Sequence, residues 1–253
     1  MDLGLKGKTA LVTGASAGIG RAIAKSLAAE GVKLCIAARR RELLEQLVRE
    51  IVAAGGQPPQ IAAVDIMENG APQKLAQEAL NRLGQIDILI NCAGGASSMS
   101  LDAPEEKWIE VMTLNFTRVR QLILAVVPDM IAHKWGRIIN ISGSSEPAGV
   151  EGGTAPKAAV HGFAKGLSRE VAKYGITINS ISPGPGKIHS EQIRRKYSEQ
   201  FIKDYSEREI PVGRFGEPEE LAYLVVCLAS PLASYITGNV MHVDGGAHRF
   251  AFT

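Results

Sequence analysis

The segment from Thr13 to Arg21 carries three glycines at a spacing that could hold a phosphate group. Gly14, Gly18 and Gly20 follow an apolar run and open an amphipathic stretch. Glycine lets the backbone turn tightly and come close to a pyrophosphate, whose charge is attracted by the N-terminus of a helix. Placed between an expected strand and an expected helix, these glycines predict a dinucleotide site.

The end of the second apolar run bears on which dinucleotide is bound. Ala38 is followed there by Arg39, Arg40 and Arg41. An acidic residue at this point would accept hydrogen bonds from the ribose 2′-hydroxyl and repel a 2′-phosphate, whereas guanidinium groups pair with phosphate. The sequence therefore favours NADP over NAD, with Arg39 and Arg40 at the phosphate and Arg41 at the solvated start of the next helix.

Short apolar runs alternate with amphipathic stretches along the chain. The runs, which we expect to be strands, are Thr9–Thr13, Leu34–Ala38, Ile61–Asp65, Ile86–Asn91, Arg137–Ile141, Thr177–Ile181 and Val240–Val243. The expected helices are Arg21–Glu30, Arg41–Ala54, Pro72–Leu83, Pro104–Ile131, Lys157–Tyr174 and Pro218–Ala229. Strands that are apolar throughout and separated by helices predict a parallel sheet covered on both faces. We predict one doubly wound α/β domain over residues 1–253, with seven parallel strands.

Composition narrows the class of protein. A chain of 253 residues suits one α/β domain, and 45% hydrophobic with 21% charged residues is ordinary for a globular protein. The net charge of +2 gives no electrostatic reason to expect nucleic acid or a membrane surface as partner. No apolar run reaches the ~20 residues of a membrane span, and no leader is apparent. The cysteines, which are Cys35, Cys92 and Cys227, have no metal-ligand spacing, so we expect no metal. The lack of a leader or span leads us to expect a cytoplasmic protein, and the dinucleotide site leads us to expect a small-molecule substrate.

Several motifs, in the same order along nearly the whole chain, resemble those of the short-chain dehydrogenase/reductase family. The first is the glycine motif described above, with its Gly-x-x-x-Gly-x-Gly spacing. The others are Asn91-Cys92-Ala93-Gly94, Leu114-Asn115-Phe116, Asn179 with Pro183-Gly184, Gly213 to Pro218, and Gly238 to Asp244-Gly245-Gly246.

This resemblance implies a strand order of 3-2-1-4-5-6-7 and a homotetramer or homodimer, with partners packing on the helices Pro104–Ile131 and Lys157–Tyr174. It also implies that Asp65 forms a hydrogen bond with the adenine of the cofactor. The full set of implied cofactor-binding residues is Gly14, Ser16, Ala17, Gly18, Ile19, Gly20, Arg39, Arg40, Asp65, Ile66, Asn91, Ala93, Gly94, Lys157, Pro183, Gly184 and Ile188.

In that family a carbonyl takes hydride from the nicotinamide while a tyrosine protonates the developing alkoxide. A lysine four residues later lowers the pKa of the tyrosine and holds the ribose, and an asparagine positions a water. Lys157 and Asn115 match the lysine and the asparagine, but Gly153 stands in the tyrosine position.

The family serine, which bonds the substrate oxygen, falls on Gly143. Ser142 and Ser144 flank this glycine, and the loop that follows is shorter than usual. The resemblance therefore implies that one of these two serines faces the substrate. The alternative for each is a hydrogen bond to the backbone, which is common for serines at strand ends.

Several groups are candidates to replace the phenol. Lys157, with a reference pKa of ~10.4 against ~10 for tyrosine, could act through a water. Glu146 and Glu151 would need burial to raise their pKa, and a surface position is favoured for both. His161 is expected to pack in the core or at an interface.

We thus expect an NADP-dependent oxidoreductase acting on a carbonyl or secondary alcohol, with a non-standard proton donor. The alternatives are a catalytically silent NADP-binding protein with a regulatory or structural role, or a lyase or isomerase that retained the nucleotide.

The charged segment Lys187–Glu209 predicts a mobile flap. Its basic residues could meet an anionic substrate, although the interspersed Glu191 and Glu199 favour a solvated helix face.

Overall fold

Seven parallel strands form one sheet in the order β3-β2-β1-β4-β5-β6-β7, as predicted. The computed structural model describes residues 1–95, 99–143, 149–184, 188, 193 and 197–249. The strands are β1 Thr9–Thr13, β2 Lys33–Ala38, β3 Gln60–Ala63, β4 Ile88–Asn91, β5 Gly136–Ile141, β6 Ile176–Ser182 and β7 Val240–His242.

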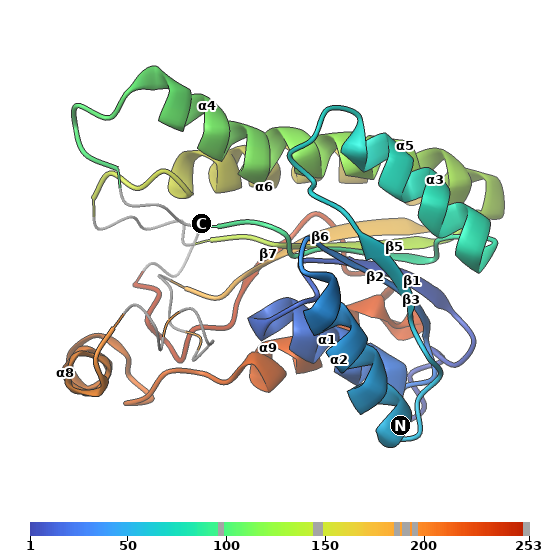
Figure 1. The fold of residues 1–253 in the computed structure, drawn as a ribbon, viewed down its shortest axis with the longest axis horizontal. Coiled ribbons are helices and arrows are strands. Elements are labelled where there is room, and N and C mark those ends of the chain that lie inside the picture. Colours follow the sequence, from blue (N-terminus) through green and yellow to red (C-terminus); the bar gives the residue numbers. More distant parts are fainter. Residues whose placement is uncertain (96–98, 144–148, 185–187, 189–192, 194–196, 250–253) are drawn as a thin grey trace.

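Helices cover both faces of this sheet (Figure 1). On one face lie α3 (Ala71–Leu83), α4 (Glu105–Met112), α5 (Arg118–His133) and α6 (Thr154–Val171). On the other lie α1 (Gly18–Ala29), α2 (Arg41–Ala53) and α9 (Pro218–Ala229), and α8 (Glu199–Glu209) stands beyond the sheet edge. Short 3₁₀ turns occupy Ala172–Tyr174 and Pro231–Ala233. Within the described residues, no helix has the length and apolarity that a membrane crossing requires.

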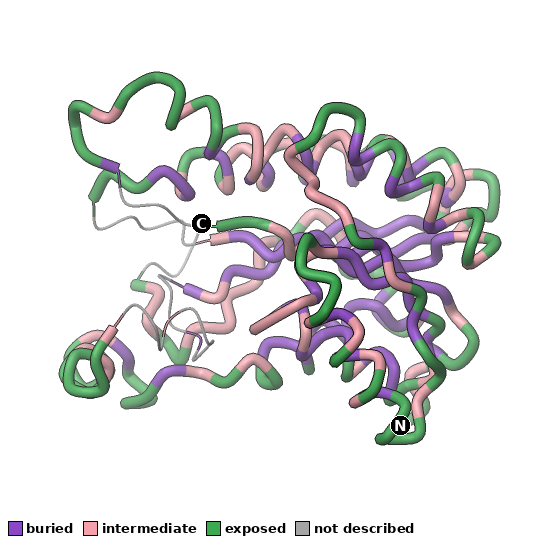
Figure 2. Tube along the Cα trace, viewed as in Figure 1, coloured by how far each residue is buried: buried purple, intermediate pink, exposed green. Residues whose placement is uncertain are grey.

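Strands β1, β4, β5 and β6 are buried along their lengths because each face of the sheet packs against its own layer of helices (Figure 2), whereas the edge strands β3 and β7 are partly exposed. Along β1, Ala10 and Val12 contribute to the core beneath α1 and α9, whereas Leu11 contributes to the core beneath α3 and α5. Successive side chains of a strand point to opposite faces, so a strand buried on both sides is predominantly apolar rather than alternating. This requirement is why the seven continuous apolar runs predict the sheet.

Three expected helices differ from those observed. Helix α1 begins at Gly18 rather than at Arg21. The helix expected over Pro104–Ile131 is interrupted by a π-helical turn at Thr113–Thr117, which separates α4 from α5. Helix α6 begins at Thr154 rather than at Lys157, so Lys157 lies in the first turn of the helix. The expected flap contains α8, and much of the remainder of that segment lies outside the described residues.

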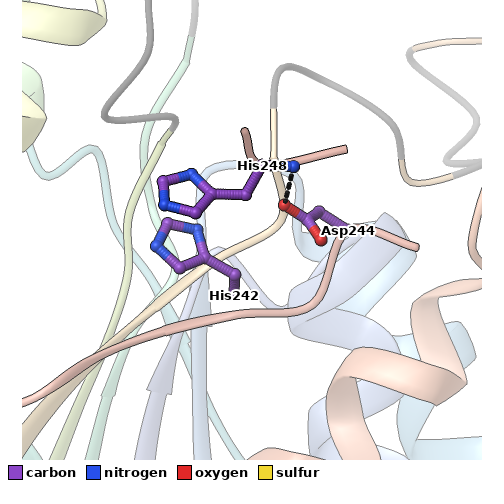
Figure 3. A group of neighbouring side chains, drawn as sticks. All are labelled: His242, Asp244 and His248. Carbon is purple, nitrogen blue, oxygen red and sulfur yellow. Dashed lines mark hydrogen bonds between the residues drawn. The ribbon is translucent and has the colours of Figure 1, made fainter. Parts of the chain in front are cut away.

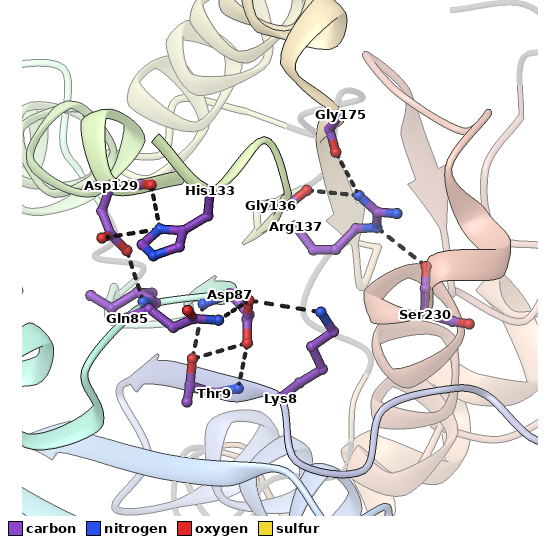
Figure 4. A network of polar contacts seen from close by, with 11 residues as sticks. Lys8, Thr9, Gln85, Asp87, Asp129, His133, Gly136, Arg137, Gly175 and Ser230 are labelled. Carbon is purple, nitrogen blue, oxygen red and sulfur yellow. Dashed lines mark hydrogen bonds and ion pairs between the residues drawn. The ribbon is translucent and has the colours of Figure 1, made fainter. Parts of the chain in front are cut away.

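A buried polar network joins the starts of the central strands (Figure 4). Arg137, on β5, is 1% exposed and donates from Nε to the carbonyl oxygen of Ser230 at 3.2 Å. Its Nη1 donates to the carbonyl oxygens of Gly136 and Gly175 at 2.8 and 3.0 Å. Burial lowers the pKa of Arg137 to about 10, so the guanidinium stays charged at neutral pH. The network is structural, because it lies at the opposite end of β5 from the residues described next.

Candidate active site

The turn between β1 and α1 admits no side chain at two of its glycines. Gly14 has a φ of +68°, and a Cβ there would lie 2.8 Å from the backbone nitrogen of Ala93. A Cβ at Gly20 would overlap the carbonyl oxygen of Gly14. The backbones of this turn and of the segment after β4 therefore lie in contact, as the close packing of a dinucleotide-binding turn requires.

Thr13 fixes this arrangement. Its hydroxyl donates to the carbonyl oxygen of Ile90 at 3.1 Å and accepts from the backbone nitrogens of Cys92 and Ala93 at 3.1 and 3.2 Å. One donor and two lone pairs are thereby all used. We did not single out Thr13 from the sequence, although a hydroxyl residue at the end of an apolar strand was a usable signal.

The N-terminus of α1 is suited to an anion. Ala17 is the N-cap residue, with an extended backbone, and its methyl side chain cannot accept a hydrogen bond from the first turn. The backbone N–H groups that a serine or aspartate would cap are thus left for a ligand. Together with the crowded glycines, this geometry fits the pyrophosphate of a dinucleotide.

Two arginines after β2 flank the glycine turn. Arg40 donates from Nη2 to the Ser16 hydroxyl at 3.3 Å, and Arg39 Nη1 lies 3.9 Å from Asp65 Oδ2. The Arg39 side chain is 75% exposed, so its guanidinium is accessible to a ligand. Arg41 points elsewhere and pairs with Glu45 on α2 at 3.6 Å.

Lys157 and Asn115 meet at Gly94. The Lys157 ammonium donates from Nζ to the carbonyl oxygen of Ile141, the last residue of β5, at 2.8 Å. A Cβ on Gly94 would lie 3.0 Å from Lys157 Nζ and 2.9 Å from Asn115 Oδ1. The structure therefore brings together the lysine, the asparagine and the segment after β4, near the carboxyl ends of β4 and β5. Asn91, the last residue of β4, donates from Nδ2 to Asn140 Oδ1 at 2.9 Å.

The π-helical turn positions Asn115. This residue is fully buried, donates from Nδ2 to the carbonyl oxygen of Val111 at 3.0 Å, and accepts at Oδ1 from the Gly95 backbone nitrogen at 3.1 Å. A single π-helical turn inside a longer helix is uncommon and often marks a functional site. Sequence periodicity does not reveal such a turn, because only one additional residue per turn is involved.

Burial changes the acidity of this cluster. Removal of the Lys157 ammonium from water lowers its pKa to about 8, and Cys92 opposes the shift only in part. Burial raises the pKa of the Cys92 thiol to about 11, so this thiol is neutral at physiological pH. Lys157 is consequently a stronger acid than its reference pKa suggests, with a pKa close to physiological pH, where a general acid works best.

Gly153 immediately precedes α6, and its carbonyl oxygen accepts from the Lys157 backbone nitrogen at 3.2 Å. Its φ of −81° and ψ of −24° are ordinary for any L-residue, so the glycine is not required by the backbone. Gly143 is also uncrowded, because a Cβ there would lie 3.5 Å from Lys157 Cγ, an ordinary contact distance.

Of the two serines beside Gly143, the structure describes Ser142. Both its backbone nitrogen and its hydroxyl donate to the carbonyl oxygen of Ile181 on β6, at 2.9 and 3.2 Å. This geometry favours the backbone-bonding interpretation for Ser142. Ser144 and Glu146 lie outside the described residues.

The remaining candidates are spread around this cluster. Glu151 is exposed, as expected. His161 is half-buried, and its pKa is lowered by burial and then by the charges of Lys157 and His242. Gly184 is buried with a φ of +70°, and Ile188 is 4% exposed and forms a parallel bridge with Gly216. Ala93, Ile19, Ile66 and Pro183 are partly buried.

Comparison with known proteins agrees with this geometry. Residues 14–248 match the family described as Enoyl-(Acyl carrier protein) reductase. The 3-oxoacyl-[acyl-carrier-protein] reductase FabG of Aquifex aeolicus is 36% identical over 255 residues, covering 97% of this chain and 99% of that protein. The protein of the same name from Vibrio cholerae is 36% identical over 250 residues, with the same coverage.

Solved structures are similar over the same length. A 3-oxoacyl (acyl-carrier-protein) reductase from Agrobacterium tumefaciens C58, with NADP bound, has a TM-score of 0.91 and 30% identity. A 7α-hydroxysteroid dehydrogenase, in complex with NADH and 7-oxo glycochenodeoxycholic acid, has a TM-score of 0.90 and 29% identity. In both cases the match covers 97% of this chain and 96% of the other. On these grounds the chain belongs to the short-chain dehydrogenase/reductase family.

Proposed function

We propose that this protein is an NADP-dependent oxidoreductase that acts on a carbonyl group or a secondary alcohol. The observation that carries the proposal is the cluster of Lys157 and Asn115 at Gly94, close to the glycine turn that suits a pyrophosphate. The relatives named 3-oxoacyl-[acyl-carrier-protein] reductase make 3-oxoacyl thioesters the first substrate class to test.

The cofactor would be held by the glycine turn, by the two arginines after β2 and by the segment after β4. The uncapped first turn of α1 would bind the pyrophosphate, and Arg39 and Arg40 would pair with the 2′-phosphate. Bound NADPH would supply the hydride for reduction of the carbonyl.

Lys157 would supply the proton. With a pKa of about 8, its ammonium can release a proton at neutral pH, and a water between Nζ and the substrate oxygen would take the place of the phenol that Gly153 lacks. The proton passes from Nζ through that water to the carbonyl oxygen as the alcohol forms, and Lys157 regains a proton from solvent. Asn115 holds the opposite side of the cluster in place through its bonds to Val111 and Gly95. Ser144 is the remaining candidate for a hydroxyl at the substrate oxygen.

A second candidate function is a catalytically silent NADP-binding protein. The observations that favour it are the glycine at position 153 and the bonding of the Ser142 hydroxyl to Ile181. Lys157 and Asn115 would then only support the ribose and the fold. The two functions predict the same cofactor binding and differ in turnover.

The test is a screen of NADPH oxidation against aldehydes, ketones, 3-oxoacyl thioesters and enoyl thioesters, with cofactor binding measured separately by nicotinamide fluorescence. Lys157→Ala is the inactivating variant, and Lys165→Ala, at an exposed position two turns along α6, is its matched control. Turnover that is lost in Lys157→Ala and kept in Lys165→Ala supports the oxidoreductase. NADPH binding without turnover of any class supports the silent alternative.

We also propose a homotetramer or homodimer. The α4–α5 region exposes Ile109, Met112 and Leu124 by 57%, 40% and 44% of their surfaces, and Gly162 and Gly166 on α6 have open space where a Cβ would lie. Large apolar side chains beside small residues suit close packing of helices between subunits. Light scattering at micromolar concentration tests this, and a monomeric mass would contradict it.

A further inference from the structure

Two histidines and an aspartate meet where β7 ends, apart from the site described above (Figure 3). His242 is the last residue of β7, and Asp244 and His248 follow it in the chain. One ligand atom from each of the three lies within 4.8 Å of the others. The imidazole rings of His242 and His248 stack with centroids 3.9 Å apart and planes inclined by 17°.

The turn after β7 brings these three side chains close together. Gly245 and Gly246 have φ angles of +66° and +84°, which reverse the chain so that His248 returns to His242. The Asp244 carboxylate fixes the turn, because Oδ1 accepts from the Gly246 backbone nitrogen and Oδ2 from the His248 backbone nitrogen, both at 3.0 Å. A carboxylate has about four lone-pair sites, so two remain for a ligand.

We propose that His242, Asp244 and His248 bind one divalent transition-metal ion, of which Zn²⁺ is the representative. Two imidazole nitrogens with one carboxylate oxygen are ligands that suit zinc and similar ions, whereas magnesium and calcium prefer oxygen ligands alone. All three residues are half-buried, so an ion can reach them and a water can complete the coordination.

The ligand atoms of the three residues must come closer together before one ion can bind them all. Bonds of about 2.0–2.1 Å from each imidazole nitrogen to a tetrahedral ion place the two nitrogens about 3.3 Å apart. His242 is held by the strand, where it pairs with Ser182 on β6. The lone pair of an imidazole nitrogen lies in the plane of its ring, so two stacked rings inclined by 17° cannot both direct a nitrogen at one ion. The stack therefore has to open for binding, and His248, which lies on the turn, is the ring that rotates toward an ion held by His242. The hydrogen bonds of Asp244 hold the carboxylate in place, as ligands to metals commonly require.

The ion would tie the C-terminal segment to the sheet next to Gly184. A Cβ on Gly184 would lie 2.7 Å from Asp244 Cβ, so the two backbones are in close contact. Arg249, one residue beyond His248, pairs with Glu209 of α8 at 2.8 Å. The proposal does not rest on the proposed hydride transfer, because none of its ligands belongs to the cluster at Lys157.

The test uses the full chain without a histidine tag, freed of metal by a chelator and then titrated with Co²⁺ and with Zn²⁺. We expect one equivalent of Co²⁺ to give a visible absorption band that Zn²⁺ abolishes, and one equivalent of Zn²⁺ to raise the midpoint of thermal unfolding. His248→Phe keeps a flat ring for the stack and removes a ligand, so it should weaken binding at least about tenfold. His133→Phe is the matched control, because His133 also lies beside an aspartate, Asp129 at 3.4 Å, and should leave binding unchanged.

Binding that is not saturated at one equivalent, or that is equal in wild type and His248→Phe, would overturn the site. If His248→Phe fails to fold, the histidine ring signals in the NMR spectrum of the wild-type chain decide the question. Two histidines should shift together with one equivalent of Zn²⁺, and Asp244→Asn should reduce the affinity of that step. Absence of a shift would equally overturn the proposal.

Discussion

The ammonium of Lys157 bonds the carbonyl oxygen of Ile141 at 2.8 Å, which joins the first turn of α6 to the last residue of β5. The bond holds a half-buried cation beside Asn115 and lowers its freedom to turn toward solvent. Because burial also lowers the pKa of Lys157 to about 8, the same placement that orders this lysine makes it a competent proton donor.

The first prediction concerns pH. In the proposed reaction the protonated form of Lys157 would donate the proton, so kcat/KM for carbonyl reduction should fall as pH rises through about 8. The sign follows from the direction of titration, since a lysine loses its donor proton on the alkaline side of its pKa. A pH–rate profile from 6 to 10 measures this, and a profile that stays flat to pH 10 would rule out Lys157 as the donor.

The second prediction restores a phenol. The backbone angles at Gly153 suit any L-residue, so Gly153→Tyr imposes no backbone strain. It should increase carbonyl reduction by less than the ~10²–10⁴ of a positioned general acid. Adding Gly143→Ser should increase the gain, since a side chain there contacts Lys157 without a clash. Initial rates of the single and double variants provide the comparison. Lower activity in a folded Gly153→Tyr that binds NADPH would mean that the glycine makes room for a working water or for substrate.

The third prediction concerns cofactor choice. Arg39→Ala and Arg40→Ala should each weaken NADPH binding by about 10- to 100-fold, as expected for loss of a charged hydrogen bond of ~1.5–3 kcal/mol, and should leave NADH binding nearly unchanged. Arg41→Ala is the control, because Arg41 pairs with Glu45. Fluorescence titration with both cofactors measures the effect. Equal affinities of the wild type for NADPH and NADH would remove the basis of the NADP assignment.

Most of the fold could be predicted from the sequence, and the reason is physical. A parallel strand buried on both faces is predominantly apolar, so β1, β4 and β5 are recognisable as short runs with few polar residues. The glycine turn could also be predicted from the sequence. Gly14 and Gly20 have to be glycines, because a side chain at either position would collide with the backbone.

What could not be predicted depends on contacts between distant segments. The lowered pKa of Lys157 follows from its burial, and the position of Asn115 follows from a π-helical turn that periodicity does not reveal. The bonding of Ser142 to Ile181 depends on the pairing of β5 with β6. The approach of His248 to His242 depends on the turn after β7, which the spacing of the two histidines in the sequence does not reveal.

The fourth prediction concerns stability. Arg137→Ala removes three hydrogen bonds to backbone carbonyl groups and a large buried side chain, so it should lower the free energy of unfolding by at least about 3 kcal/mol. Arg49→Ala, at an exposed position on α2, should change it by no more than about 0.5 kcal/mol. Urea denaturation followed by circular dichroism compares the two. Similar small losses in both variants would show that water replaces the guanidinium at little cost.

The central claim is that Lys157 takes part in carbonyl reduction although position 153 is a glycine. The most direct measurement is the single-turnover rate of NADPH oxidation with a 3-oxoacyl thioester, in wild type and in Lys157→Ala, at cofactor concentrations that saturate both. We predict measurable turnover in the wild type and a loss of about 10²-fold or more in Lys157→Ala. Equal rates in the two proteins, or NADPH binding with no turnover in the wild type, would contradict the account.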